Sequence, residues 1–288
     1  MKPILTRKQL SAYARLMRLN RPIGIYLVLW PTLWALWLAA EGFPDISTLL
    51  IFCLGVVLMR SAGCVINDYA DRNIDGHVSR TADRPLVTGE VSPKEALFLF
   101  AGLCGLAFLL VLFTNRLTIY LAFGALALAM CYPFMKRYTH LPQVVLGAAF
   151  AWAVPMAFAA QSGKLEPSSW LVYTAVVLWT VAYDTFYAMA DREEDLKIGV
   201  KSTAILLGDM DRMMIGSLQA LMMFAMFLVG GRFSLSFWYY LSLAIATVLF
   251  VYQHIITQER EPKRCIDAFL NNNLVGLVLF IGIVLGSF

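Results

Sequence analysis

The sequence predicts an all-α membrane protein whose nine transmembrane helices form one bundle. Its 288 residues are 60% hydrophobic and only 15% charged, which is too apolar for an ordinary soluble domain. Apolar runs of about 17 to 21 residues, long enough to cross a ~30 Å hydrocarbon core as helix, recur along the whole chain. Three consecutive asparagines, residues 271–273, interrupt the last run. We expect the spans at Ile23 to Ala40, Ile46 to Ile66, Ala96 to Phe113, Thr118 to Met135, Val144 to Ala160, Trp170 to Ala190, Met213 to Val229, Phe237 to Thr257 and Phe269 to Phe288.

The distribution of Lys and Arg predicts how the spans are oriented. The N-terminal arm, residues 1–22, contains six of them, the connections after the second, fourth, sixth and eighth spans contain thirteen, and the other four connections contain three. By the positive-inside rule the basic side is cytoplasmic, which places the N-terminus in the cytoplasm and the C-terminus in the periplasm. Because the net charge of +4 follows from this topology, it gives no reason to expect a nucleic-acid partner, and the lipid bilayer is the expected surrounding.

Two of the cytoplasmic connections begin with nearly the same acidic string. It reads A-D-R-N-I-D at residues 70–75 and A-D-R-E-E-D at residues 190–195. These connections, about residues 67–95 and 191–212, belong to the single intramembrane domain that we expect over residues 1–288. If the preceding spans continue as helix, the acids of each string share one helix face and lie over the cytoplasmic mouth of the bundle.

The acids on these two faces are Asp68, Asp71 and Asp75 in the first and Asp184, Asp191 and Asp195 in the second. Solvated helix ends explain one or two acids, but like charges stacked on one face repel each other and cost stability. Mg²⁺ relieves such repulsion, and it typically combines one or two carboxylates with water and substrate phosphate oxygens. The pattern therefore predicts two facing clusters that hold a diphosphate through bridging Mg²⁺ ions.

Cationic side chains near the acids fit the same interpretation. Guanidinium and ammonium groups would neutralise the remaining charge of the diphosphate. A diphosphate at the mouth of an apolar helical bundle indicates a lipid-tailed substrate, whose hydrocarbon would lie among the spans. The cations near the two strings, or between the fourth and fifth spans, are Arg72, Arg80, Arg84, Lys136, Arg137, Arg192, Lys197 and Lys201.

The two acidic stretches resemble the aspartate motifs of the UbiA superfamily of intramembrane aromatic prenyltransferases. The first is N-D-x-x-D-x-x-x-D at residues 67–75, and the second is Y-D-x-x-Y-A-x-x-D-x-x-x-D at residues 183–195. Three more stretches resemble the bacterial 4-hydroxybenzoate polyprenyltransferase branch of that superfamily: R-P-I-G-x-x-L-x-L-W-P at 21–31, D-G-H-V-x-R-T-A-D-R-P-L at 75–86 and Y-P-F-M-K-R-Y-T-H-L-P-Q-V-V-L-G at 132–147.

This resemblance implies a nine-helix bundle in the bacterial inner membrane with a cytoplasm-facing active-site cavity. It also implies an Mg²⁺-dependent enzyme of ubiquinone biosynthesis, which transfers a polyprenyl group from polyprenyl diphosphate to ring carbon 3 of 4-hydroxybenzoate. Asp68 and Asp184 match the motifs, but their roles stay open. Carried over onto the matching positions, the metal and diphosphate roles fall on Asn67, Asp71, Asp75, Asp191 and Asp195.

Two other functions fit part of the pattern. A relative in the same superfamily can act on another aromatic acceptor, and ring specificity does not follow from residue physics. A secondary transporter also places acids in membrane helices. Its acids lie near the bilayer midplane, however, whereas those of this chain gather at one face.

The carboxylate of an aromatic acid requires a cation close to the carbon that reacts. Arg137 is the first candidate, because it lies in a short connection that faces the mouth. Arg60 is the second candidate. It lies within the second span, eight residues before Asp68, where an unpaired charge would be costly.

Overall fold

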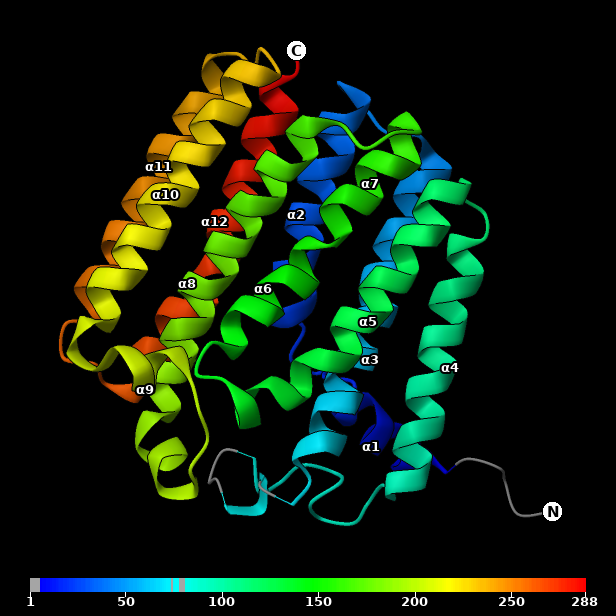
Figure 1. The fold of residues 1–288 in the computed structure, drawn as a ribbon, viewed down its shortest axis with the longest axis vertical. Helices are drawn as coiled ribbons and strands as arrows, with labels where there is room; N and C mark the ends of the chain where they lie inside the picture. Colours follow the sequence, from blue (N-terminus) through cyan, green and yellow to red (C-terminus); the bar gives the residue numbers. More distant parts are fainter. Residues whose placement is uncertain (1–5, 74, 78–80) are drawn as a thin grey trace.

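The long helices of the chain run side by side along one direction (Figure 1). The computed structural model describes residues 6–73, 75–77 and 81–288, and it contains no strand within those ranges. Two short 3-10 helices, η1 (Asp75–His77) and η2 (Gly208–Met210), lie in the connections. The α-helices are α1 (Arg7–Leu16), α2 (Ile23–Ala40), α3 (Ile46–Asp71), α4 (Pro93–Val111), α5 (Arg116–Tyr138), α6 (Pro142–Ala151), α7 (Ala153–Ser162), α8 (Pro167–Ile198), α9 (Thr203–Leu207), α10 (Asp211–Arg232), α11 (Phe237–Ile256) and α12 (Pro262–Gly286).

Nine segments within the described ranges are long and apolar enough to cross a membrane, so the predicted number of spans is confirmed. One of them, Pro142–Ser162, consists of two helices, because the chain is interrupted at Trp152 between α6 and α7. The cause is Pro155, which has no N–H for the carbonyl four residues earlier and whose ring crowds that carbonyl. The expected fifth span is therefore a single crossing built from two helices.

The helices that carry the acidic strings are longer than the apolar runs. α3 continues past the expected end at Ile66 as far as Asp71, and α8 continues past Ala190 as far as Ile198. The non-helical parts of the two expected loops are correspondingly shorter. The whole second acidic string is therefore helical, as the prediction that its acids share one helix face requires.

The asparagines of α12 do not interrupt it, because each side-chain oxygen accepts a hydrogen bond from a neighbouring helix. A polar group buried among apolar helices is costly unless it is hydrogen-bonded. These bonds also connect α12 to α2, α8 and α11. The pairs are Trp30 with Asn273 at 2.8 Å, Trp179 with Asn272 at 2.8 Å and Gln253 with Asn271 at 2.9 Å.

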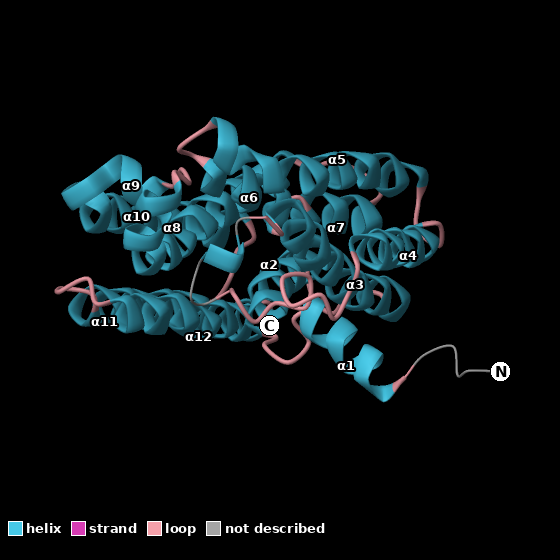
Figure 2. Ribbon diagram, turned by 90° about the horizontal axis from the view of Figure 1, so that it is seen from below, coloured by secondary structure: helices cyan, strands magenta, loops and turns pink. Residues whose placement is uncertain are grey.

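One end of the bundle carries α1, the connection from α3 to α4, and α9, and we call it the mouth end; the C-terminus lies at the opposite end (Figure 1). Figure 2 is viewed from the mouth end and shows α1 beside α3. Within the basic arm, Thr6 and Gln9 form a capping box that starts α1. Ala12 and Leu16 then bury its apolar side in a small core cluster that includes Val65 of α3. The predicted phosphate-neutralising residue Arg80 lies outside the described residues.

Candidate active site

A cavity of about 1160 Å³ connects the mouth end with the interior of the bundle. Its wall is formed by residues of α1 to α8 and of α12, together with the connection after α3. Both acidic strings contribute to this wall, although they are 120 residues apart in the sequence. Deeper parts of the wall are apolar, with side chains such as Leu27, Phe52, Leu126 and Met156. The cavity therefore has a charged mouth and an apolar interior.

Arginines neutralise part of the first acidic string. Asp68, which is only 1% exposed, accepts hydrogen bonds of 3.1 Å to each carboxylate oxygen from the Nη2 atom of Arg18. Arg84 lies between two acids, with its Nη1 atom 3.0 Å from Asp68 Oδ1 and 2.5 Å from Asp75 Oδ2. Burial opposes the charge of Arg84, but the two carboxylates outweigh it and hold the pKa of Arg84 above its usual value. Arg84 is therefore a permanent cation at the mouth.

The two carboxylate oxygens of Asp71 differ in their contacts. Its Oδ2 atom is paired with the ammonium group of Lys136 at the end of α5. Its Oδ1 atom is buried and has no hydrogen-bond partner in the part of the chain that the structure describes. Asn67 lies one helical turn earlier on α3 and lines the same cavity. Since an unsatisfied buried oxygen is rare in native structures, this atom is a candidate ligand position.

The second acidic string contributes to the cavity wall from a single helix, α8. Asp184, Asp191 and Asp195 all belong to the wall, and each also interacts with other groups of the chain. Gly199 ends α8 in the left-handed conformation, with φ of 72°. The chain then turns back, and the backbone N–H of Lys201 donates to the carbonyl of Lys136 at 3.3 Å. The side chain of Lys201 also lines the cavity.

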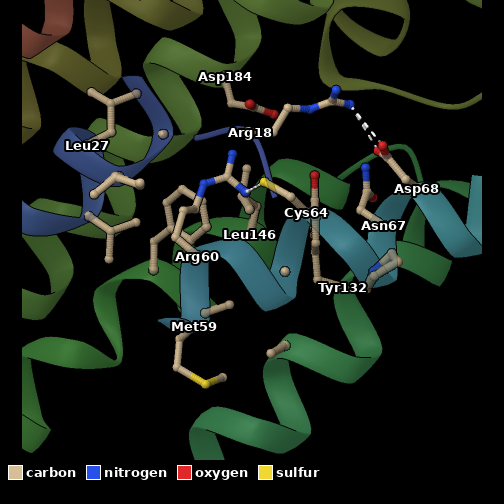
Figure 3. Close-up of a pocket in the computed structure, with 18 of the residues that line it drawn as sticks. Arg18, Leu27, Met59, Arg60, Cys64, Asn67, Asp68, Tyr132, Leu146 and Asp184 are labelled. Atoms are coloured by element: carbon tan, nitrogen blue, oxygen red, sulfur yellow. Dashed lines mark hydrogen bonds and ion pairs between the residues drawn. The ribbon is translucent and has the colours of Figure 1, made fainter. Parts of the chain in front are cut away.

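Arg60 is a cation deep in the cavity wall (Figure 3). It lies eight residues before Asp68 on α3, or about 12 Å further into the bundle at ~1.5 Å of rise per residue. Its Nη1 atom donates to Cys64 Sγ at 3.1 Å, and its guanidinium carbon lies 5.3 Å from the ring centroid of Phe150. The Nε atom is buried and has no hydrogen-bond partner among the described residues. In Figure 3, Cys64, Tyr132 and Asp184 surround the same part of the cavity.

Four of the predicted cations within the described residues do not line the cavity, namely Arg72, Arg137, Arg192 and Lys197. Arg72 donates to the carbonyl of Tyr69 at 2.6 Å and stacks on its ring. Arg137 is exposed and donates to the carbonyl of Ala70 at 2.5 Å, so it fixes α5 against the end of α3. Arg192 is directed away from the cavity and pairs with Asp211. Of the expected set, Arg60, Arg84, Lys136 and Lys201 line the cavity.

The sequence interpretation assigned no site role to Arg18, and it treated Tyr132 only as one of several aromatic candidates for the wall around the hydrocarbon tail. Arg18 follows α1 and reaches Asp68, because its backbone adopts the left-handed conformation with φ of 58°. The capping box at Thr6 was the available signal that the arm is a helix rather than an extended segment. Tyr132 stands four residues before Lys136 on α5, so the two share a helix face.

The donor set fits Mg²⁺ only if substrate completes the shell. Within the described ranges, no group of three or more His, Cys, Asp or Glu is arranged closely enough to hold a metal by itself. Mg²⁺ does not need such a group, because it commonly binds through one or two carboxylates plus phosphate oxygens and water. The buried Oδ1 atom of Asp71 has no hydrogen-bond partner among the described residues, and Asp191 and Asp195 line the same cavity.

Comparison with known proteins identifies the family. A profile of the UbiA prenyltransferase family matches residues 28–281, which is most of the chain. The chain belongs to the UbiA prenyltransferase family. It is 66% identical over 275 residues to a 4-hydroxybenzoate octaprenyltransferase from Saccharophagus degradans, across 96% of this chain and 92% of that protein. It is 63% identical over 273 residues to a 4-hydroxybenzoate octaprenyltransferase from Ectopseudomonas mendocina, across 95% and 92%.

Solved structures share the UbiA fold. A UbiA homolog from Aeropyrum pernix K1 superposes with a TM-score of 0.80 at 27% identity, over 91% of this chain and 96% of that one. A UbiA homolog from Archaeoglobus fulgidus, bound to GPP and Mg²⁺, superposes with a TM-score of 0.71 at 18% identity, over 95% and 99%. At 18% identity, the similarity to the Archaeoglobus fulgidus protein shows a shared fold alone. The expected superfamily and its helical architecture are thus confirmed.

Proposed function

We propose that this UbiA family member transfers a polyprenyl group from polyprenyl diphosphate to ring carbon 3 of 4-hydroxybenzoate, as an Mg²⁺-dependent enzyme of ubiquinone biosynthesis. The observation that carries the proposal is the convergence of both acidic strings and Arg60 on one cavity. The identity of 66% to a 4-hydroxybenzoate octaprenyltransferase over nearly the whole chain supports the same acceptor.

The mouth of the cavity would bind the diphosphate. Asp71, Asp75, Asp191 and Asp195 would hold Mg²⁺, which supplies Lewis-acid polarisation of the phosphate oxygens when it is bound. Lys136 and Arg84 are paired with two of these acids and Lys201 lines the same cavity, so the three would neutralise charge that builds up on the departing diphosphate. Because Lys136 and Arg84 are paired with Asp71 and Asp75 in the structure, they would exchange these carboxylates for phosphate oxygens when the donor binds.

Arg60 would bind the carboxylate of the acceptor, in place of Arg137. Arg60 lines the cavity, and its buried Nε–H has no hydrogen-bond partner within the described residues, whereas Arg137 is exposed and bonded to the end of α3. A cation held in a water-poor pocket favours an anionic ligand strongly. With its carboxylate on Arg60, the acceptor would lie deeper in the cavity than the diphosphate. The ring of the acceptor would then point toward the mouth.

The chemical step then follows from this arrangement. The allylic C–O bond breaks with its electron pair leaving on the diphosphate, carbon 3 of the ring forms the new C–C bond, and the proton on carbon 3 is lost to restore aromaticity. The chain contributes by positioning the ring against the allylic carbon and by excluding water that would trap the carbocation. Apolar residues of α3, α5 and α7 form the wall at this depth and would hold the hydrocarbon tail.

The membrane location and orientation belong to the same proposal. The nine candidate spans make the chain a multi-pass membrane protein, and its curated relatives are bacterial. We place it in the bacterial inner membrane with the mouth end in the cytoplasm, because the basic arm and the basic connections gather there.

An acceptor panel tests the assignment. Purified protein in detergent would be incubated with Mg²⁺, geranyl diphosphate and, separately, 4-hydroxybenzoate, a dihydroxynaphthoate and an acceptor without a carboxylate. We expect one product, from 4-hydroxybenzoate, with the prenyl group on carbon 3 by NMR. Preferential reaction of another ring would assign the chain to a different acceptor within the family.

A further inference from the structure

A cluster of three charged residues lies just outside the cavity, beside the second acidic string. We call Arg192, Asp211 and Arg260 the Asp211 cluster. Asp211 is fully buried and forms ion pairs with Arg192 of α8 and with Arg260 of the turn before α12. The Nε atom of Arg260 lies 3.2 Å from both carboxylate oxygens of Asp211, and its Nη2 atom lies 3.0 Å from Oδ1. The cluster therefore joins α8, the start of α10 and the turn before α12.

The two arginines of the cluster also form hydrogen bonds with the neighbouring backbone. Arg192 also donates to the carbonyl of Gly208 at 3.2 Å, and Arg260 donates to the carbonyl of Asp209 at 2.8 Å. Arg260 has a left-handed backbone with φ of 53°, which is uncommon for a residue with a side chain. Such conformations persist where the surrounding contacts determine them, and they are frequent near functional sites.

The end of α8 needs such support because it extends beyond the membrane. With 32 residues, α8 is about 48 Å long at ~1.5 Å per residue, whereas the hydrocarbon core is ~30 Å thick. Asp191 and Asp195 lie on this last part and line the cavity, while none of the three cluster residues does. Arg192 follows Asp191 directly, so one helix turn presents an acid to the cavity and a cation to Asp211.

We propose that the Asp211 cluster is a positioning device that fixes the rotation of the end of α8, so that Asp191 and Asp195 point into the cavity. By holding Arg192 on the far side of the helix, Asp211 sets the direction of both acids. This inference rests on the proposed diphosphate site and extends it to residues that touch neither substrate. Residues that orient metal ligands commonly change metal affinity by about 10- to 100-fold when they are replaced.

The test measures binding rather than turnover. The full chain in detergent would be titrated with Mn²⁺, as a spectroscopic substitute for Mg²⁺, in the presence of inorganic diphosphate. We expect Asp211→Asn to weaken Mn²⁺ binding by about tenfold. Arg260→Lys keeps the charge but loses the forked geometry, so it should give a smaller, several-fold loss and carries the test if Asp211→Asn does not fold. The matched control is Asp267→Asn, which removes an exposed ion pair with Arg264 from the same end of α12.

A double-mutant cycle separates positioning from general loss of stability. If Asp211 acts through Asp191 and Asp195, then Asp211→Asn should change Mn²⁺ affinity by less than about twofold in a background that carries both Asp191→Asn and Asp195→Asn. Wild-type Mn²⁺ affinity in the folded Asp211→Asn and Arg260→Lys variants would overturn the inference. An equal tenfold loss of Mn²⁺ affinity on Asp211→Asn, with and without the acids of the second string, would also overturn it. Unchanged affinity in Asp195→Asn alone would instead overturn the proposed diphosphate site itself, together with the inference that depends on it.

Discussion

Gly24 of α2 lies against the guanidinium of Arg60 on α3, so closely that a Cβ atom at position 24 would be 2.4 Å from Arg60 Nε. Any larger residue at this position would displace the arginine. The nearest atoms belong to the end of a flexible side chain, so the arginine would move rather than the backbone. The contact thus links a glycine of the R-P-I-G stretch to the orientation of the proposed acceptor-binding cation.

Replacing this glycine should impair acceptor binding. We expect Gly24→Ala to raise KM for 4-hydroxybenzoate by about tenfold, because small displacements of a positioning group are costly in an active site. The protein should remain folded, since alanine is the better helix former. Gly102→Ala on α4 is the matched control, because a Cβ there meets no atom of the described residues within 4 Å and the residue is not part of the cavity wall. Equal KM values for 4-hydroxybenzoate in the two variants would show that Gly24 has no specific role in acceptor binding.

Removing the cation should have a larger effect of the same kind. Arg60→Ala should raise KM for 4-hydroxybenzoate by about 10- to 100-fold, as expected from a lost charged hydrogen bond of ~1.5–3 kcal/mol. KM for the prenyl diphosphate should change little. Arg137→Ala should leave the acceptor KM unchanged, and the opposite ranking of the two variants would restore Arg137 as the carboxylate-binding residue.

The acids should be indispensable for turnover and not for folding. Asp71→Asn and Asp191→Asn should each lower kcat by at least about a hundredfold, because they remove charge that stabilises the departing diphosphate through the metal. Gel filtration and thermal unfolding in detergent would check the fold, with Asp267→Asn as an exposed acidic control on α12. Near-normal turnover in saturating Mg²⁺ would contradict the assignment of either string.

The asparagines of α12 should matter for stability. Asn272→Leu leaves the buried indole N–H of Trp179 without an acceptor, so we expect a loss of ~1–3 kcal/mol in the free energy of unfolding. Asn273→Leu should cost less, because its partner Trp30 is only half-buried. Thermal unfolding in detergent measures both. A greater loss from Asn273→Leu would show that burial does not set the cost.

Much of the architecture could be predicted from the sequence, because length and apolarity are local properties. The spans, the two acidic strings and their common position at one end follow from them. The direction of each cation does not, since it depends on which helices pack together. Arg192 illustrates the difference: it follows Asp191 by one residue, so the 3.6-residue period already places it on another face, but its partner Asp211 is known only from the fold. The contacts of Arg18 and Arg84 likewise depend on how the arm and the connection after α3 fold back over the mouth.

The central claim is that the two acidic strings form one Mg²⁺-dependent prenyl transfer site. The most direct measurement uses membranes that contain the protein, labelled 4-hydroxybenzoate and a prenyl diphosphate, with either Mg²⁺ or EDTA. We predict labelled prenylated product with Mg²⁺ and none with EDTA, and its loss in both Asp71→Asn and Asp191→Asn. Product formation that persists in EDTA, or that survives the loss of either string, would contradict the account.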